Sequence, residues 1–113
     1  MTIQRLDRNA WRNYFDFMSK FLEGKRAEIE VASLSMGEQV QAEWLPLLGI
    51  TYDAKDDLIE VALEGVDHLI RKPREVHVED GARELNSIEI VDAEGTIQIV
   101  KLRDPLMLLA PAH

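Results

Sequence analysis

The chain has 113 residues, 46% of them hydrophobic and 30% charged, and its formal net charge is −8. This length and apolar content suffice for one packed core, so we expect residues 1–113 to form a single domain. The absence of cysteine excludes disulfides, thiolate catalysis and zinc–sulfur sites, and it fits a reducing compartment. A charged N-terminus and the lack of a long apolar run predict a soluble, cytoplasmic protein that does not bind membranes.

The negative charge is spread unevenly along the sequence. Residues 1–30 hold six Lys or Arg against five Asp or Glu, and the remaining 83 hold seven against sixteen. The one basic cluster, Arg71, Lys72 and Arg74, is flanked by Asp67 and Glu75. An acid-rich chain of this kind repels phosphate backbones, so nucleic acid is not expected as a partner.

The first predicted element is an amphipathic helix over about residues 8–23. Apolar side chains from Trp11 to Leu22 recur at three- and four-residue steps, which gathers them on one face. Asp7 is expected to cap the start of the helix, and Gly24 to end it.

After Gly24 the apolar residues alternate with polar ones, which predicts an antiparallel sheet over about residues 26–103. The expected strands lie at about 27–31, 40–44, 50–52, 58–63, 75–79, 87–91 and 97–102. Pro46 has no N–H, so the second strand is expected to end there or to lie at an edge. Together the elements predict an α+β fold, with the N-terminal helix packed on a curved antiparallel sheet of six to seven strands, as a partial barrel or roll.

The predicted core combines one face of the helix with the inward positions of the strands. Its members are Trp11, Phe15, Met18, Leu22, Ile29, Val31, Trp44, Ile59, Val61, Val76, Val78, Ile88, Ile90, Ile97 and Ile99. The C-terminal tail, residues 105–113, is apolar without strand alternation. Burying its large side chains at roughly 1.5–3 kcal/mol each rivals the net stability of a domain, so the tail is expected to complete the core or to form an interface.

Residues 65–68, Gly-Val-Asp-His, contain the only adjacent acid–imidazole pair in the sequence. If the backbone turns there, Asp67 can orient His68 as a general base or metal ligand, and Tyr52 or Asp53 can complete a ligand pocket. The interpretation we favour is a structural turn in which Asp67 accepts hydrogen bonds from backbone amides.

Other chemistry is not supported by the sequence. The His residues lack the spacing of a metal site, the acid-rich loop at 53–57 lacks the calcium-loop pattern, and no phosphate-binding glycine loop or nucleophile elbow occurs. We therefore predict no catalytic residue, no metal and no cofactor.

The chain as a whole resembles a family of short bacterial proteins known as a domain of unknown function. The residues that carry the resemblance are Trp11, Tyr14 and Phe15, the segments 46–53, 67–70, 72–73 and 93–95, and the pair Pro105 and Leu106. The resemblance covers nearly the full length and implies one complete domain. It implies no activity, cofactor or substrate.

These observations predict a small, soluble, non-enzymatic binding or protein-interaction module. We expect it to form a homodimer, or to hold a protein partner, through the apolar tail or a sheet edge. The alternative is a small-molecule or metal-dependent site centred on Asp67 and His68.

Overall fold

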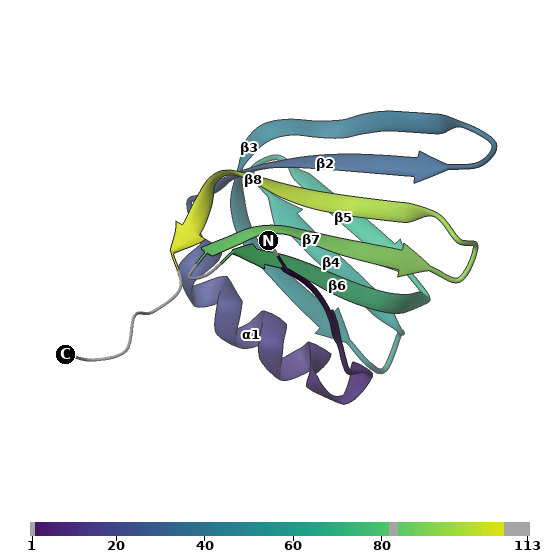
Figure 1. The fold of residues 1–113 in the computed structure, drawn as a ribbon, viewed down its shortest axis with the longest axis horizontal. Coiled ribbons are helices and arrows are strands. Elements are labelled where there is room, and N and C mark those ends of the chain that lie inside the picture. The colour runs from purple at the N-terminus through teal and green to yellow at the C-terminus, as the bar shows by residue number, and fades with distance from the viewer. Residues whose placement is uncertain (1, 82–83, 108–113) are drawn as a thin grey trace.

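The computed structural model describes residues 2–81 and 84–107. In chain order the elements are β1 (Thr2–Leu6), the short 3-10 helix η1 (Arg8–Ala10), α1 (Trp11–Leu22), β2 (Arg26–Ser33), β3 (Gly37–Asp53), β4 (Leu58–Leu63), β5 (Val66–Arg71), β6 (Pro73–Gly81), β7 (Glu84–Asp92) and β8 (Ile97–Met107). All strands pair antiparallel, in the order β1-β6-β7-β8-β2-β3-β4-β5 (Figure 1). Within the described ranges, no helix is long and apolar enough to cross a membrane.

The predicted sheet of six to seven strands is wrong, because the sheet has eight. β1 and β5 were not expected, and the predicted strands at 40–44 and 50–52 are parts of the single strand β3. The segment 65–68 is not a turn. The turn consists of Glu64 and Gly65, where Gly65 has a φ of +81°, and Val66 already pairs with Leu63.

The helix is also shorter than predicted. It spans Trp11–Leu22 and follows η1, and the Asp7 side chain makes no capping hydrogen bond. The tight 3-10 helix comes between Asp7 and the first turn of α1, so the carboxylate is not placed at the free amides of α1.

β3 gives the sheet its shape. Its 17 residues pair with β2 as far as Pro46 and with β4 from Leu47 onward. Two register shifts along the β2 pairing and one along the β4 pairing mark bulges, and Trp44 within this stretch has a φ of +50°. Because bulges bend a strand and increase its twist, the sheet folds over and the second half of β3, with β4 and β5, lies behind β8 and β7 (Figure 1).

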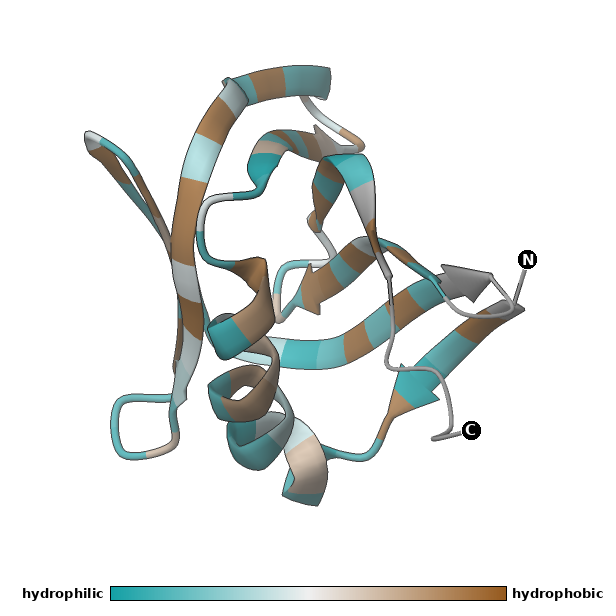
Figure 2. Ribbon diagram, turned by 90° about the vertical axis from the view of Figure 1, so that its left-hand side faces the viewer, coloured by the Kyte–Doolittle hydropathy of each residue, from teal (hydrophilic) through white to brown (hydrophobic). Residues whose placement is uncertain are grey.

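The core lies between the two halves of the sheet and α1. Figure 2 shows the apolar positions, in brown, alternating with polar ones along the strands that surround it. Most of the predicted core residues are buried, but Val31, Trp44, Ile97 and Ile99 are only partly so.

The exceptions on β8 come from strand parity. Gln98, Val100 and Leu102 face inward there, which turns Ile97 and Ile99 to the other face. Of the predicted tail, Leu106 is buried on β8 and is 7% exposed, and residues 108–113 lie outside the described residues.

α1 covers the edge that β3 exposes once it has left β2. The Ser19 hydroxyl donates to the Ile50 carbonyl at 2.8 Å and accepts from the Ile50 amide at 2.9 Å. Three residues before Ile50, the Leu47 carbonyl accepts from the Gly24 amide at 2.8 Å, and the Leu47 amide donates to the Lys25 carbonyl at 2.7 Å. The helix and the residues that follow it therefore continue the hydrogen bonding of β3 where β2 ends.

Replacing Ser19 with alanine should leave both backbone groups of Ile50 without a partner. We expect S19A to lower the free energy of unfolding by about 1–3 kcal/mol, the cost of unsatisfied buried polar groups, as measured by urea denaturation. The matched control is S35A, because Ser35 lies in an exposed turn and, among the residues that the structure describes, its hydroxyl forms a hydrogen bond only with that of Ser33, at 3.5 Å. Equal stabilities of S19A and S35A would contradict the role given to Ser19.

A cross-strand ion pair joins β2 to β8. Lys101 Nζ lies 2.6 Å from Glu30 Oε2. The hydrogen bond from Lys101 lowers the pKa of Glu30 from its ordinary 4.5, although desolvation acts against it. The hydrogen bond that Lys101 donates to Glu30 raises the pKa of Lys101 from its ordinary 10.5. The pair therefore stabilises the fold between these ordinary values, and its contribution is lost as the pH falls through the lowered pKa of Glu30 or rises through the raised pKa of Lys101.

The stability difference between the wild type and E30Q should depend on pH accordingly. The Lys101 side chain is 44% exposed and solvent screens its charge, so we expect at most about 1 kcal/mol at neutral pH. The difference should shrink as the pH is lowered from neutrality past the ordinary 4.5 of a glutamate and through the lowered pKa of Glu30, because Glu30 then becomes protonated in the folded protein. Urea denaturation across this range, with E94Q in the exposed β7–β8 turn as control, measures it. A difference that stays constant with pH would contradict the ion pair.

Candidate functional site

Asp67 and His68, the residues singled out by the sequence, lie on the edge strand β5. β5 pairs only with β4 among the described strands. Side chains alternate along a strand, so His68 and Ile70 face the core while Asp67, Leu69 and Arg71 face solvent, in agreement with their burial. Asp67 and His68 thus leave β5 on opposite faces, and the carboxylate is not placed against the imidazole.

The imidazole of His68 is held by Gln98 instead. His68 Nε2 forms a short hydrogen bond with Gln98 Oε1, and Gln98 Nε2 donates to Asp92 Oδ2 at 3.0 Å. Asp92 is itself fixed, since its Oδ1 accepts from the amides of Glu94 at 2.9 Å and Thr96 at 3.0 Å. We assign the shared proton of the first bond to His68 Nε2, because the amide nitrogen of Gln98 is already a donor to Asp92.

This chain of hydrogen bonds is suited to holding strands together. A neutral carboxamide does not titrate near pH 7, so Gln98 cannot pass a proton from His68 to Asp92. Gln98 is only 7% exposed, and its two bonds tie β5 in one half of the sheet to β8 and the β7–β8 turn in the other.

A groove of about 280 Å³ runs between β5 and the β2–β3 hairpin. It is lined by Val31, Ser33, Met36, Gly37, Gln39, Gln41, His68, Leu69 and Gln98. None of these described lining residues is an acid, a lysine or an arginine. A second hollow, of about 440 Å³, borders the other side of Leu69 and Gln98 and reaches Arg71 and the β7–β8 turn. The free edge of β5 therefore borders two hollows that share Leu69 and Gln98.

Tyr52 and Asp53 lie elsewhere on the folded sheet. Tyr52 on β3 pairs with Ile59 on β4, which in turn pairs with Ile70 on β5. His68 pairs with Val61, two residues farther along β4. Asp53 closes its own turn, because its Oδ1 accepts from the amides of Lys55 at 3.0 Å and Asp56 at 3.3 Å. The ligand site predicted on Tyr52, Asp53, Asp67 and His68 stays a prediction. No hydrogen bond between side chains of described residues joins Tyr52 or Asp53 to Asp67 or His68. In residues 2–81 and 84–107, no group of three or more His, Asp and Glu is arranged to hold a metal ion.

The Tyr52 hydroxyl belongs to a network around Arg8. It donates to Asp57 Oδ1 at 3.1 Å and accepts from Arg8 Nη1 at 3.0 Å. Burial and the hydrogen bond to Asp57 raise the pKa of Tyr52. Arg8 also donates to the Pro73 carbonyl at 2.7 Å and lies 4.5 Å above the Trp11 ring. Arg8 is thereby fixed to β3, β6 and α1 at once.

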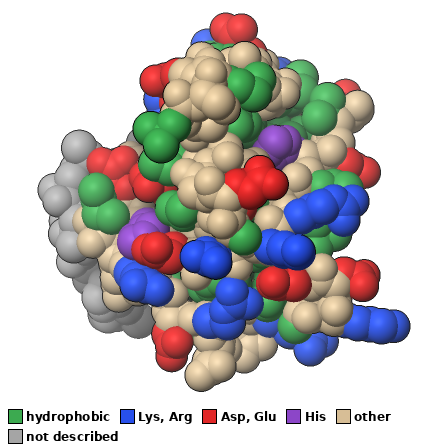
Figure 3. Space-filling view, turned by 90° about the vertical axis from the view of Figure 1, so that its right-hand side faces the viewer, with side chains coloured by type: hydrophobic (Ala, Val, Ile, Leu, Met, Phe, Trp, Pro, Cys, Tyr) green, Lys and Arg blue, Asp and Glu red, His purple; other side chains and the backbone are tan. Residues whose placement is uncertain are grey.

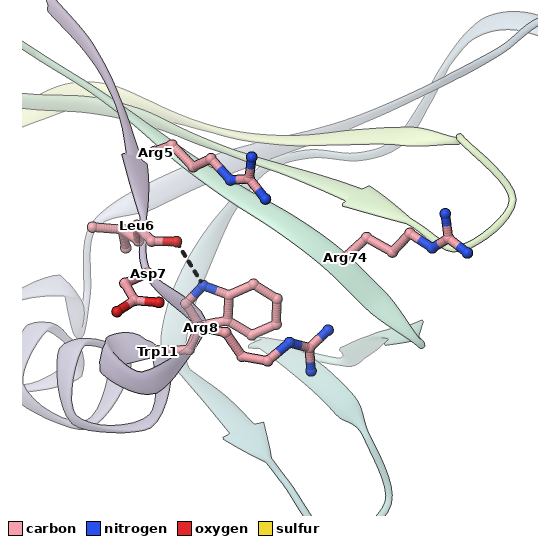
Figure 4. Close-up of a pocket in the computed structure, with 6 residues that line it drawn as sticks. All are labelled: Arg5, Leu6, Asp7, Arg8, Trp11 and Arg74. Atoms are coloured by element: carbon pink, nitrogen blue, oxygen red, sulfur yellow. Dashed lines mark hydrogen bonds between the residues drawn. The ribbon is translucent and has the colours of Figure 1, made fainter.

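A hollow of about 350 Å³ opens beside this network (Figure 4). It is lined by Arg5, Leu6, Asp7, Arg8, Trp11 and Arg74. The Trp11 ring is held in place by a hydrogen bond from its Nε1 to the Leu6 carbonyl at 3.2 Å. Arg5 and Arg74 both line this hollow because β1 pairs with β6 along its length, with Arg5 opposite His77.

Sequence reasoning missed both Gln98 and the arginine hollow. Gln98 lies between Ile97 and Ile99 in the sequence, so the isoleucines were predicted to face the core and Gln98 to face solvent. The basic cluster at 71–74 and the positive excess in residues 1–30 were visible, but only the β1–β6 pairing shows that Arg5 and Arg74 share one hollow.

Comparisons with known proteins support the resemblance seen in the sequence. Residues 2–111 match the "Family of unknown function (DUF5335)". An "Uncharacterized protein" of Aquifex aeolicus (strain VF5) is 38% identical over 109 residues, which cover 96% of this chain and 98% of that protein. No solved structure matches the chain. The resemblance to a bacterial domain of unknown function is thus confirmed, and the chain belongs to the DUF5335 family.

Proposed function

We propose that this protein is a non-enzymatic binding module that forms a homodimer through the free edge of β5. The observation that carries this proposal is that the exposed side of β5 is complementary to a second copy of itself.

The backbone of β5 offers three residues for pairing. Leu63 and Val66 close a two-residue hairpin, so Val66, His68 and Ile70 direct their N–H and C=O groups toward β4. Asp67, Leu69 and Arg71 therefore direct theirs toward the free edge. Unpaired edge groups of this kind are a template for another strand.

The charges of β5 favour one register. When two copies pair antiparallel about a two-fold axis at Leu69, Asp67 of each copy lies opposite Arg71 of the other, and the two Leu69 side chains face each other. Opposite charges and apolar side chains in such positions contribute roughly 0.2–1 kcal/mol per pair. If one copy of β5 is shifted by two residues along the other, Asp67 no longer lies opposite Arg71 and the two Leu69 side chains no longer face each other. The symmetric register is therefore the most favourable.

Exposed apolar surface lies next to this edge. Val66 is 40% exposed, Leu69 42% and Met36, across the groove, 64%. Covering such side chains contributes to association through the hydrophobic effect. The other edge strand, β1, is less suitable, because Arg5 is its one charged residue and a second β1 would offer it no opposite charge.

The proposal also selects between the two interfaces expected from the sequence. Leu106 of the apolar tail is packed in the core of its own chain, so it is not available to a partner. His68 supports a binding role over a catalytic one, because its Nε2 is engaged by the amide of Gln98.

A charge-reversal series tests the dimer. D67R and R71D should each place like charges opposite one another twice in the symmetric interface, and each should weaken dimerisation by at least about tenfold. The double variant D67R/R71D restores opposite charges and should recover the dimer. Analytical ultracentrifugation over a concentration series measures the dissociation constants.

Two further variants make the result decisive. D56R reverses a charge in the exposed β3–β4 turn and should leave the dimer intact. A chain that ends at residue 107 should also remain dimeric if β5 forms the interface. A monomeric wild type, or a dimer that is lost on removing residues 108–113 and is insensitive to the reversals at β5, would overturn the proposal.

A further inference from the structure

We infer that the hollow between Arg5, Arg8 and Arg74 is a binding site for the phosphate group of a small phosphorylated molecule. The site lies apart from the β5 edge strand, and the inference does not depend on the proposed dimer.

Three arginines from three separate elements line this hollow. Arg5 comes from β1, Arg8 from η1 and Arg74 from β6. Figure 4 shows the Arg5 and Arg8 side chains on either side of the Trp11 ring and the Arg74 guanidinium farther out and directed away from the ring, whereas the Asp7 carboxylate points the opposite way. Three arginines thus border one concavity in a chain whose net charge is −8. Figure 3 shows several Lys and Arg side chains on the lower half of one face of the molecule, with Asp and Glu side chains between them.

Arg8 provides a preorganised donor. It is fixed by Pro73, Tyr52 and the Trp11 ring, and its approach to Asp57 Oδ1 is long, at 3.4 Å. That same carboxylate oxygen also accepts from the Tyr52 hydroxyl, so it is shared. A guanidinium has five N–H donors, and the three hydrogen bonds of Arg8 to described residues leave two for a ligand.

The charges of Arg5 and Arg74 are poorly neutralised by the protein. Arg5 Nη1 lies 3.9 Å from Glu75 Oε1, and both side chains are more than one-third exposed. Glu75 Oε1 also lies 3.0 Å from His77 Nε2, so Arg5 does not have this carboxylate to itself. Arg74 forms no ion pair with any residue that the structure describes. Exposed pairs of this kind are worth little, which leaves both guanidinium groups available.

The size and donor geometry of the hollow define the ligand class. A phosphate monoester carries about −1.5 to −2 charges at neutral pH and three acceptor oxygens, and arginine forks match such oxygens in pairs. A volume of about 350 Å³ is at the lower end of ligand sites, which suits a phosphate on a small molecule. Leu6 and Trp11 supply apolar contact for the group that the phosphate carries.

Calorimetric titration of the full chain with inorganic phosphate near pH 7.5, at constant ionic strength, tests the site. We expect saturable binding to the wild type, with R5Q and R74Q each weakening it by about tenfold or more, because each removes charge-assisted hydrogen bonds. R74K keeps the charge but loses the fork and should bind between the wild type and R74Q. Arg8 is left unchanged because it anchors β3, β6 and α1.

The control is R103Q, which removes the same charge from an exposed position near the far end of β8. It should bind phosphate like the wild type, and thermal unfolding of every variant checks that the fold is intact. Lack of saturable binding at millimolar phosphate, or an equal loss in R103Q, would overturn the inference. Tighter binding of malonate than of phosphate would overturn the assignment to phosphate.

Discussion

The structure depends on how β3 passes from one half of the sheet to the other. A strand that leaves its neighbour exposes backbone donors and acceptors, and burying them without partners is costly. Here the backbone of Gly24 and Lys25 forms hydrogen bonds with the backbone of Leu47. The Ser19 hydroxyl forms hydrogen bonds with the amide and the carbonyl of Ile50. This exchange positions α1 on β3 and allows β4 and β5 to lie behind β8. Both proposed sites follow from it, because it leaves β5 as a free edge and brings η1 to Tyr52 and Pro73.

The sequence predicted elements well where local pattern decides them. The apolar residues from Trp11 to Leu22 recur with the period of a helix and not with that of a strand, and α1 spans this same range. β5 was missed because its hairpin turn has only two residues, so Asp67 and His68 looked like part of the turn. The parity error on β8 has another cause. A glutamine enters the core when it finds hydrogen-bond partners, and those of Gln98 lie 6 and 30 residues away in the chain.

The same contrast explains what could be foreseen of the sites. Adjacency drew attention to Asp67 and His68, but strand alternation sends adjacent side chains to opposite faces. The self-complementarity of Asp67 and Arg71 has meaning only once β5 is known to be an edge, and the arginine hollow requires the pairing of β1 with β6. Local sequence therefore drew attention to Asp67 and His68, but it revealed neither the strand on which they lie nor the role of its residues.

One rigid corner of the chain separates the two proposed sites. Arg71 ends β5, and Arg74 lines the hollow only three residues later. Between them the Lys72 amide donates to the Asp57 carbonyl at 2.9 Å, the Lys72 carbonyl accepts from Ala93 at 2.9 Å, and the Pro73 carbonyl accepts from Arg8. Because the β3–β4 turn, the β7–β8 turn and η1 each hold this corner, a change of charge at either end leaves the backbone of the other in place. The chain can thus carry a self-pairing edge and an anion site side by side, each with its own arginines.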